Sequence, residues 1–449
     1  MTQASGAAAS RPPSRVVVVG GSLAGSRTVL ALRRAGHDGP ITLVSAEPHL
    51  PYDRPPLSKE LLAGETTAAE IALDPKGAQT YRDLDVEVLL GSPATALDVE
   101  RKVVAVGAAD RPADRTAGRA AGTELPYDVL VIATGATARP LPGTERFARR
   151  GSRVHTLRTV DDALAIRAEL SPGAAVVVVG AGFIGSEVAA SAVARGCDVT
   201  VVEAAPAPLT RGLGSRLGAA VGALHERNGA RLLLGAGVAE ILGGRAGSAA
   251  GTADGAGDTA TAVRLTDGTV LPADVVVVGI GVVPATGWLA GSGLALDDGV
   301  LCDGCGRAGA PGVYAVGDVA RLPNAWLGPE PVRTEHWTAA VEHASLVAAN
   351  IVGPDEAAVY DSVPFVWSDQ YDARIQIAGH TSESLTMAPL LGDVDGDAFV
   401  AGFHDGDRLR GVVALNSMRA FVRFRRLLTE HPTSAQAADL AQSLAAGPP

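Results

Sequence analysis

The stretch VVVVGAGFIGSEVAASAVARGCDVTVVE, residues 176–203, decides the fold of this chain more than any other. Val176–Val179 form an apolar run, which is typical of a buried parallel strand that helices cover on both faces. A helix is expected over Ser186–Arg195 and a second strand over Val199–Val202. A strand, a glycine-rich turn, a helix and a strand in this order predict a βαβ unit of the Rossmann type.

The turn of this unit has the spacing of a dinucleotide-binding motif. Gly180 permits a tight turn, Gly182 lets a pyrophosphate approach the helix N-terminus, and Gly185 lets helix and strand pack closely. Glu203 ends the next strand, where a carboxylate binds the 2′-hydroxyl of an adenosine ribose. The alternative is a glycine-rich turn that binds no ligand. The expected binding residues of this unit are Gly180, Gly182, Phe183, Ile184, Gly185 and Glu203.

An imperfect copy of the motif lies near the N-terminus. Val16–Val19 lead into GGSLAG, residues 20–25, in which Ser22 stands where the middle glycine is expected. Serine is small and keeps its backbone N–H, so the approach of a phosphate is crowded rather than blocked. The strand Ile41–Val44 is followed by Glu47, a residue or two beyond the usual place of the acid. The expected binding residues of this unit are Gly20, Ser22, Leu23, Ala24, Gly25 and Glu47.

Length and composition set the broad class. A chain of 449 residues is too long for one ordinary core, so two to three domains are expected. The formal net charge of −11 argues against a nucleic-acid partner, because no basic surplus exists to neutralise phosphates. The apolar runs are too short to span a bilayer, and we see no signal peptide. Three cysteines are too few for a disulfide framework, so we expect a soluble cytoplasmic protein.

Other apolar segments extend the domain organisation. Val129–Ala133 and Val275–Val278 predict two further buried strands. Near the C-terminus the pattern changes, with strands expected in Phe365–Ala378 and Phe399–Leu415 and an arginine-rich helix over Met418–Leu428. This part of the chain is expected to form a separate α+β unit.

Four blocks carry a resemblance to a known family. They are PYDRPPLSK at 51–59, LVIATG at 130–135, GVYAVGD at 312–318 and WSDQY at 367–371. With these blocks the chain resembles the pyridine nucleotide-disulfide oxidoreductase superfamily. More narrowly, through the first and last blocks, it resembles the ferredoxin reductases that serve cytochromes P450 and Rieske-type oxygenases. The resemblance implies FAD on the first unit and a nicotinamide dinucleotide on the second.

The same resemblance implies roles for three charged residues. Asp318 is expected to bind the ribityl hydroxyls of the flavin, and a plain helix cap is the alternative. Lys59 is expected beside the flavin N5, where a cation stabilises negative charge on reduction; a solvated lysine at a helix start is the alternative. Glu187 is expected to point toward Lys59 and the nicotinamide, and a solvent-facing glutamate is the alternative.

The remaining site residues follow from the resemblance in the same way. Gly135 suits a chain crossing beside a phosphate, because glycine has no Cβ to clash there. Ala94 stands where the family often has valine, so its expected contact is through the backbone. A surface ion pair and a core aromatic are the alternatives for Arg158 and Trp337. The further expected cofactor-binding residues are Arg54, Ala94, Thr134, Gly135, Arg158, Gly281 and Trp337.

The cysteines do not have the pattern of a thiol enzyme. Disulfide reductases of the superfamily keep a redox pair soon after the first glycine motif, and none lies there. Cys302 and Cys305 form a CxxC without a second CxxC or a histidine pair, so neither a redox role nor a metal site is expected. Cys197 is expected to be a small buried hydrophobe.

Without a thiol relay, electrons must leave the flavin for a partner or a small oxidant. A ferredoxin is strongly acidic and suits docking near Arg419, Arg423, Arg425 and Arg426; a solvated helix face is the alternative. No lysine or arginine directly follows Glu203, which favours NADH over NADPH. Arg211 lies further along the chain and leaves NADPH possible.

The sequence therefore predicts an α/β fold with two Rossmann-type dinucleotide-binding domains, similar to glutathione reductase, plus a C-terminal α+β domain. The FAD domain is expected in two parts, 14–140 and 273–328, with an NAD domain at 141–272 between them and an interface domain at 329–449. We expect an NADH-dependent ferredoxin reductase without a metal. The alternatives are a reductase of a small acceptor (oxygen, a quinone or a nitrogen species) and a redox-sensing flavoprotein resembling apoptosis-inducing factor.

Overall fold

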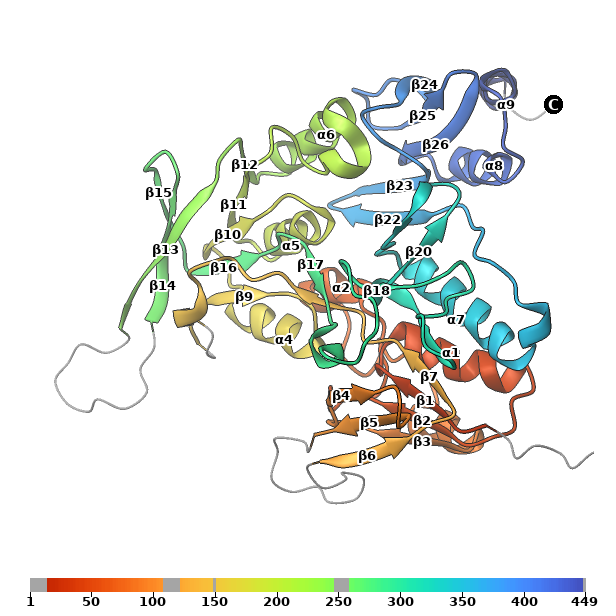
Figure 1. The fold of residues 1–449 in the computed structure, drawn as a ribbon. Coiled ribbons are helices and arrows are strands. Elements are labelled where there is room, and N and C mark those ends of the chain that lie inside the picture. The colour runs from red at the N-terminus through yellow and green to blue at the C-terminus, as the bar shows by residue number, and fades with distance from the viewer. Residues whose placement is uncertain (1–13, 108–121, 148–150, 246–257, 447–449) are drawn as a thin grey trace, which may run out of the picture.

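The computed structural model describes residues 14–107, 122–147, 151–245 and 258–446. These residues form two units built on parallel sheets and a C-terminal unit built on an antiparallel sheet, which confirms the expected fold class. Figure 1 shows the second unit at the left, the C-terminal unit at the upper right and the first unit below them.

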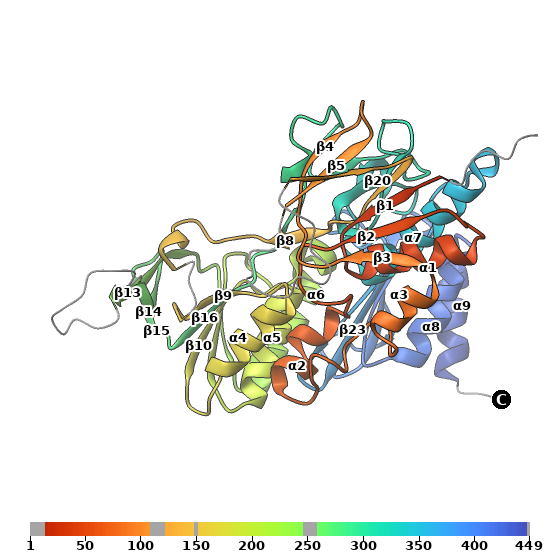
Figure 2. The same cartoon turned by 90° about the horizontal axis from the view of Figure 1, so that it is seen from below.

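The first unit is a parallel sheet in the order β19-β7-β1-β2-β3. Its strands are β1 (Val16–Val19), β2 (Ile41–Val44), β3 (Val86–Leu89), β7 (Val129–Ile132) and β19 (Val313–Ala315). One face packs on helices α1 (Leu23–Arg34), α3 (Ala78–Asp83) and α7 (Trp337–Val352). The other face packs on an antiparallel sheet of β4 (Ala94–Asp98), β5 (Val103–Val106) and β6 (Thr123–Pro126). Figure 2 shows the parallel sheet between these two layers.

The second unit repeats this plan with the sheet order β12-β11-β10-β16-β9. Its strands are β9 (Val154–Thr156), β10 (Ala175–Val179), β11 (Asp198–Glu203), β12 (Arg231–Leu234) and β16 (Val275–Val278). Its helices are α4 (Val160–Glu169), α5 (Phe183–Ala194) and α6 (Thr210–Arg227). A three-stranded antiparallel sheet again follows, made of β13 (Val238–Arg245), β14 (Asp258–Leu265) and β15 (Val270–Pro272).

The structure corrects the expected boundary after residue 272. Strand β16 lies beyond that boundary, yet it pairs with β10 in register Val177↔Val276 and so belongs to the second sheet. The chain returns to the first unit through β17 (Val282–Pro284), which pairs with β8 (Ala136–Ala138).

Short elements lie between these strands and helices. They are α2 (Glu60–Ala63), β18 (Val300–Leu301), β20 (Ala320–Asn324), β21 (Gly328–Val332) and the 3₁₀ segments Pro55–Ser58, Glu145–Phe147, Gly287–Leu289, Gly317–Val319 and Pro354–Glu356. Three of them, Pro55–Ser58, α2 and Glu145–Phe147, pack against the core of the second unit. The boundary expected at residue 329 also needs correction. Helix α7 follows it, but Val347 and Ala348 of α7 are buried in the core of the first sheet with Val16.

The C-terminal unit is an antiparallel sheet in the order β22-β23-β26-β25-β24. Its elements are β22 (Phe365–Gln370), β23 (Ala373–Gly379), β24 (Thr386–Gly392), β25 (Phe399–Asp405), β26 (Arg408–Leu415), α8 (Met418–Leu428) and α9 (Ser434–Ala445). The strands and the helix expected from the sequence are therefore confirmed. Helices α8 and α9 cover one face, and α6 of the second unit covers the other with Leu213, Leu217, Val221 and Leu224.

None of the helices in the described ranges is long and apolar enough to cross a membrane. Nor do the described side chains include a group of three or more His, Cys, Asp or Glu residues placed to hold a metal ion.

Candidate functional site

Both glycine motifs lie between a parallel strand and a helix, as expected. Gly20 and Gly180 have positive φ angles of 124° and 99°, and a Cβ on either would overlap a carbonyl oxygen of the neighbouring strand end. A Cβ on Gly25 or Gly185 would overlap the carbonyl oxygen of Gly20 or Gly180, respectively. These four positions therefore admit only glycine, and they bring each helix N-terminus close to its strand.

The middle position of the motif tolerates serine. Ser22 has φ −117° and ψ −160°, and Gly182 has φ −75° and ψ −177°, both of which are extended conformations open to any residue. Ser22 uses its hydroxyl to accept a hydrogen bond from Nε of Arg54 at 3.0 Å. Serine at position 22 thus adds a polar contact just before α1 and does not strain the backbone.

The two units differ at the end of the second strand. Val179 pairs with Val202, so Glu203 lies one residue beyond the pair; in the first unit Val19 pairs with Val44, and the equivalent position is Ser45. The carboxylate of Glu203 accepts hydrogen bonds from the amides of Ala181, at 2.7 Å, and Ala205, at 2.8 Å. The first unit therefore has a hydroxyl where the second has a carboxylate, and Glu47 lies two residues further on.

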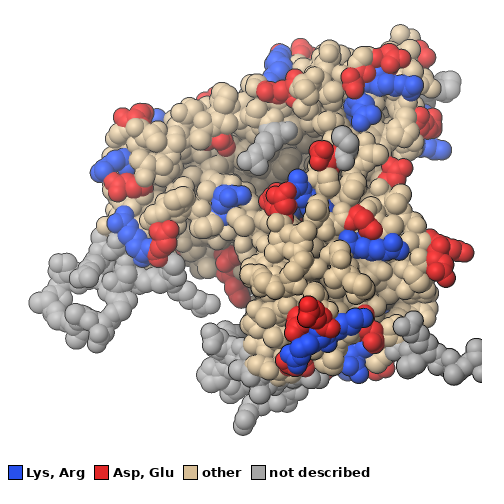
Figure 3. All heavy atoms as spheres, in the orientation of Figure 1, with Lys and Arg blue, Asp and Glu red and all other residues tan. Residues whose placement is uncertain are grey.

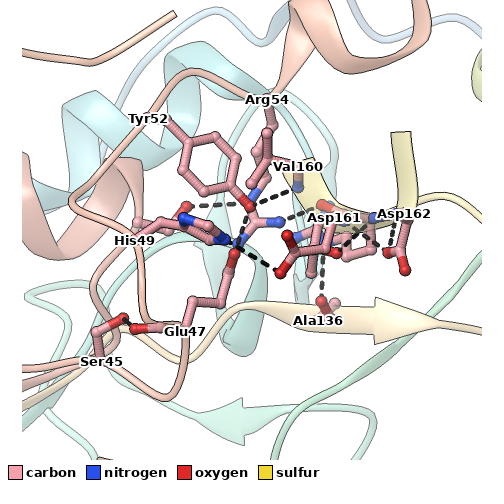
Figure 4. A network of polar contacts seen from close by, with 12 residues as sticks. Ser45, Glu47, His49, Tyr52, Arg54, Ala136, Val160, Asp161 and Asp162 are labelled. Carbon is pink, nitrogen blue, oxygen red and sulfur yellow. Dashed lines mark hydrogen bonds and ion pairs between the residues drawn. The ribbon is translucent and has the colours of Figure 1, made fainter. Parts of the chain in front are cut away.

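Glu47 belongs to a network that joins several expected FAD-binding residues (Figure 4). Its carboxylate is paired with Arg54 at 2.8 Å and also accepts a hydrogen bond from the Tyr52 hydroxyl. Arg54 in turn donates to the backbone carbonyl of Arg158. The Arg158 guanidinium pairs with Asp318 at 2.8 Å and donates to the carbonyl of Ala136.

This network gathers side chains from distant parts of the sequence. Ser22, Glu47, Arg54, Arg158 and Asp318 are expected FAD-binding residues, and all five lie in one hydrogen-bonded chain. Most are only partly exposed, with Arg158 and Asp318 at 26% and 18% of their side-chain surface. The surface-ion-pair alternative for Arg158 does not describe a pair so covered.

The other expected cofactor-binding residues lie around the same region or at the second motif. The Trp337 indole N–H donates to Asp53 at 2.7 Å, and Trp337 is only partly buried rather than a core aromatic. Thr134 donates to the carbonyl of Ala285 at 2.9 Å, and Gly135 has φ 65°. The remaining expected residues are Leu23 and Ala24, buried in the first turn of α1; Ala94, at the start of β4; Phe183 and Ile184, in the first turn of α5; and Gly281, between β16 and β17.

Lys59 and Glu187 meet between the units. Lys59 Nζ lies 3.4 Å from Oε1 of Glu187 and 3.0 Å from Oδ2 of Asp369, and only 5% of the Glu187 side chain is exposed. Burial raises the pKa of Glu187 above the ordinary value of a glutamate, while Lys59 and two serine hydroxyls oppose that rise. Neither alternative, a solvated lysine or a solvent-facing glutamate, describes this buried pair.

Sequence reasoning missed several partners of this pair. Ser58 and Ser368 each donate to Glu187 at 2.6 Å, and Asp369 binds Lys59. All three lie inside the blocks PYDRPPLSK and WSDQY. The two blocks contain these three residues, but only the fold brings Ser58 and Ser368 to the Glu187 carboxylate and Asp369 to Lys59. The face shown in Figure 3 is hollowed where α6, β22 and the β20–β21 hairpin of Figure 1 come together.

The cysteines lie apart from this site. All three are free thiols, and Cys197 and Cys302 are buried. Cys302 donates to the carbonyl of Val300, and burial raises its pKa to about 12. A thiol held in its neutral form is a poor nucleophile, so Cys302 lacks the low pKa of a redox-active cysteine.

The first unit has features that fit a bound dinucleotide. Gly20 and Gly25 let β1, β7 and α1 pack closely, which places the N-terminus of α1, whose backbone N–H groups attract a pyrophosphate, at the end of the sheet. His336 Nδ1 is buried and has no hydrogen-bond partner among the described residues. Burial lowers the pKa of His336 to about 4, with Asp318 opposing that change. A neutral imidazole beside Asp318 is thus free to bond a polar group of a ligand.

The chain is similar to known proteins over nearly its whole length. Residues 14–344 match the family described as pyridine nucleotide-disulphide oxidoreductase, and residues 365–446 match the family described as reductase C-terminal. Rhodocoxin reductase of Rhodococcus erythropolis is 37% identical over 431 residues, which cover 94% of this chain and 92% of that protein.

Two further matches span nearly the whole chain. The ferredoxin–NAD(+) reductase component of the p-cumate 2,3-dioxygenase system of Pseudomonas putida is 34% identical over 414 residues, which cover 92% of this chain and 92% of that protein. Among solved structures, the covalent putidaredoxin reductase–putidaredoxin complex matches with a TM-score of 0.85 at 30% identity, covering 97% of this chain and 99% of that chain.

Proposed function

This chain belongs to the pyridine nucleotide-disulphide oxidoreductase family, and from this premise we propose that it is an FAD-dependent NADH:ferredoxin oxidoreductase. The observation that carries the proposal is the buried Lys59–Glu187 pair, which lies between two glycine motifs without a cysteine beside it. Relatives that match more than nine-tenths of the chain are reductases of ferredoxins or similar carriers by name, which supports the same activity.

FAD is assigned to the first unit. The glycine cradle of Gly20 and Gly25 takes the pyrophosphate, and Asp318, held by Arg158, takes the ribityl hydroxyls. Trp337 and the unpartnered nitrogen of His336 add contacts at the N-terminus of α7. The cofactor is assigned from these side chains together with the family, and the proposed oxidoreductase activity rests on it.

NADH is assigned to the second unit. Glu203 accepts two backbone hydrogen bonds, which fix its side chain at the end of β11, the place proposed for the adenosine ribose. A carboxylate there accepts a hydrogen bond from a 2′-hydroxyl and repels a 2′-phosphate. NADPH is therefore the poorer coenzyme.

The side chains between the units then have defined tasks. The chemistry that FAD supplies when bound is acceptance of a hydride from the nicotinamide and release of two electrons one at a time. Lys59 places a positive charge beside the reacting ring, Glu187 orients that charge, and Asp369 shares it. Lys59 and Glu187 are nearly enclosed, with 12% and 5% of their side chains exposed, so water screens this pair little.

Electrons leave without a thiol relay, because no cysteine lies near Lys59 in sequence and Cys302 is held neutral. An iron–sulfur ferredoxin is the acceptor that we propose. The three free thiols also favour a reducing compartment, so we place the activity in the cytoplasm.

Helix α8 is the proposed docking surface. It buries Phe421, Phe424 and Leu428 and exposes Met418 and Val422. Beside these apolar side chains lie Arg419, Arg423, Arg425 and Arg426, none of which has an ion pair among the described residues. An apolar patch with unpaired arginines suits an acidic partner.

The docking surface also adjoins the Lys59 region. Arg425 covers the ring of Phe365 at 4.2 Å, and Phe365 stacks on Trp367 at 5.7 Å. Lys59 Nζ lies 5.8 Å from the centre of the Trp367 ring. Two aromatic side chains, Phe365 and Trp367, would therefore lie between Lys59 and a ferredoxin docked on α8.

Charge reversal tests the docking surface. We expect Arg419→Glu with Arg423→Glu to raise the KM for ferredoxin at least tenfold, with a weaker salt dependence, and to leave NADH–ferricyanide turnover unchanged. Lys76→Glu with Arg82→Glu, a matched reversal on the first unit, should change neither. An unchanged KM in the α8 variant would remove α8 from the docking surface.

Turnover separates the proposed function from its rivals. We expect NADH to reduce cytochrome c rapidly only when a ferredoxin is added. Turnover with oxygen, a quinone or a nitrogen species at the same rate without ferredoxin would identify a small-acceptor reductase. Binding of both nucleotides with negligible turnover would identify a redox-sensing flavoprotein.

A further inference from the structure

The buried carboxylate of Glu187 is the point at which all three units of the molecule meet. Glu187 comes from α5 of the second unit, Ser58 from the first unit and Ser368 from β22 of the C-terminal unit. The inference below concerns these hydroxyls and rests on the proposed function.

Each carboxylate oxygen of Glu187 receives its own hydroxyl. Ser58 Oγ donates to Oε2 at 2.6 Å, and Ser368 Oγ donates to Oε1 at 2.6 Å. Lys59 Nζ approaches Oε1 at 3.4 Å. Ser58 and Ser368 are themselves buried, at 1% and 0% exposure, so water cannot replace either hydroxyl.

Strand β22 serves both members of the ion pair because its side chains alternate between two faces. On one face, Gln370 donates from Nε2 to Ser368 Oγ at 3.2 Å, which turns the hydroxyl proton of Ser368 toward Glu187. On the other face, Trp367 lies beside the Lys59 ammonium and Asp369 accepts its hydrogen bond at 3.0 Å. The block WSDQY thus contacts both the Glu187 carboxylate and the Lys59 ammonium from strand β22.

We propose that Ser58 and Ser368 are positioning residues that keep Glu187 ionised and turned toward Lys59, so that the C-terminal unit sets the charge of the reaction centre as well as docking the partner. A hydrogen bond donated to a carboxylate stabilises its charged form, and burial favours the neutral form. Burial raises the pKa of Glu187, and the charge of Lys59, followed by the hydrogen bonds from Ser368 and Ser58, opposes that rise. Without these hydrogen bonds, Glu187 takes up a proton and no longer neutralises Lys59.

Other charged groups near Glu187 act on it less directly. Asp369 faces Lys59 and is shared with Arg374 of β23 at 3.6 Å. His225 of α6 contacts Ser186, the neighbour of Glu187, and Tyr371. Burial lowers the pKa of His225 to about 4, so it stays neutral above that pH. On α5 itself, Arg195 binds backbone carbonyls at the far end of the helix.

The test uses the FAD-loaded enzyme and the variants Ser58→Ala, Ser368→Ala and their combination. The rate of flavin bleaching by NADH is measured against pH. In each single variant the pH below which the rate falls should rise by about one to two units, because each hydroxyl stabilises a charged acceptor. The double variant should shift further. Ser368→Thr, which keeps the hydroxyl, should restore the wild-type profile.

A second readout does not depend on activity. The infrared carbonyl band of a protonated carboxyl group is recorded at pH 7 and assigned with Glu187→Gln. The wild type should lack this band, and the double variant should show it. If the double variant loses FAD, the single variants provide both measurements.

Ser191→Ala is the matched control. Ser191 is buried on the same helix and donates from its hydroxyl to the backbone carbonyl of Ser58 at 2.7 Å, whereas the hydroxyls that donate to the Glu187 carboxylate are those of Ser58 and Ser368. It should leave the pH profile in place. Serine variants with the wild-type profile and no carboxyl band would overturn the proposal, and so would an equal shift in Ser191→Ala. If the proposed function itself fails, the wild type will not be bleached by NADH, whereas the infrared test still applies.

Discussion

The two Rossmann-type units share one plan and differ at two positions. In both, four parallel strands have the same spatial order, β7-β1-β2-β3 and β16-β10-β11-β12, and an antiparallel three-stranded sheet is inserted between two of them, β3 and β7 or β12 and β16. The fifth strand differs, because β19 comes last in its sheet along the chain and β9 comes first. In both, the first and last glycines of the motif meet a carbonyl oxygen where a Cβ would stand. The middle glycine and the acid of the second unit, Gly182 and Glu203, are replaced in the first unit by Ser22 and Ser45.

This difference separates the positions at which the backbone requires glycine from the positions at which the residue type varies between the units. Backbone geometry requires glycine at the first and last positions of the motif, and both units keep it there, as Gly20 and Gly25 and as Gly180 and Gly185. Ser22 and Gly182 have extended backbone angles that any residue adopts, and Ser45 and Glu203 follow the residues that pair with the last residues of β1 and β10. In the first unit Glu47 pairs with Arg54, and a second carboxylate, that of Asp318 far along the chain, pairs with Arg158.

The largest effect is expected at the shared glycines. Gly25→Ala and Gly185→Ala should each destabilise the protein by about 3 kcal/mol or more, because the new Cβ overlaps a backbone carbonyl. Gly25→Ala should also purify without FAD, while Gly185→Ala keeps FAD and loses NADH binding. Denaturant unfolding and the flavin absorbance per protein measure both effects.

Gly287→Ala is the control for this pair, because Gly287 has open space around its Cβ position and no positive φ. Its stability should stay within about 1 kcal/mol of wild type. Equal loss of FAD in Gly25→Ala and Gly185→Ala would contradict the assignment of one nucleotide to each unit.

The next effect concerns the acid that only the second unit has. The wild type should prefer NADH over NADPH in kcat/KM by roughly thirtyfold to a thousandfold, or about 2–4 kcal/mol. Glu203→Ser or Glu203→Arg should shrink or reverse this preference, because the repulsion of the 2′-phosphate is removed. Both coenzymes must be compared at one ionic strength.

Glu226→Ser, which removes an exposed glutamate from α6, should leave the coenzyme preference unchanged. A wild type that uses both coenzymes equally well would contradict the role given to Glu203.

A smaller effect is expected at the anion of the first unit. Asp318→Ala should weaken FAD binding roughly tenfold to a hundredfold, or about 1.5–3 kcal/mol, and leave much of the protein colourless. The melting temperature should fall as well, because bound cofactor stabilises the folded state. Asp297→Ala removes a largely exposed partner of Arg321 and should keep the flavin. Full FAD loading of Asp318→Ala would exclude Asp318 from the site.

The smallest effect is expected from exchanging the middle residues. Ser22→Gly loses one hydrogen bond to Arg54 and should change FAD affinity by about 1 kcal/mol, roughly fivefold. Gly182→Ser should reduce NADH affinity by less than about tenfold, because its backbone angles accept any residue. Titration of each nucleotide measures both. A hundredfold loss in either variant would show that the middle position is as constrained as the outer glycines.

Local sequence patterns predicted helices and strands, but they did not predict which sheet each strand joins. The glycine motifs, the strands near Phe365 and Phe399 and the helix Met418–Leu428 are all confirmed. The four valines of β16 predicted a buried strand correctly, but assignment of that strand to the first unit was wrong. A run of valines is the same in either sheet, so only pairing with β10, about a hundred residues earlier, decides the unit.

The sequence by itself determined the two βαβ turns, because turn geometry depends on neighbours within a few positions. Through the family resemblance it also predicted roles for Lys59, Glu187 and Asp318, and these roles remain proposals. The tertiary structure alone decided that Ser45 matches Glu203, that Arg158 holds Asp318, and that Ser58 and Ser368 meet at Glu187. Those contacts join segments up to 181 residues apart, and no local pattern encodes which distant side chain will complete a buried hydrogen bond.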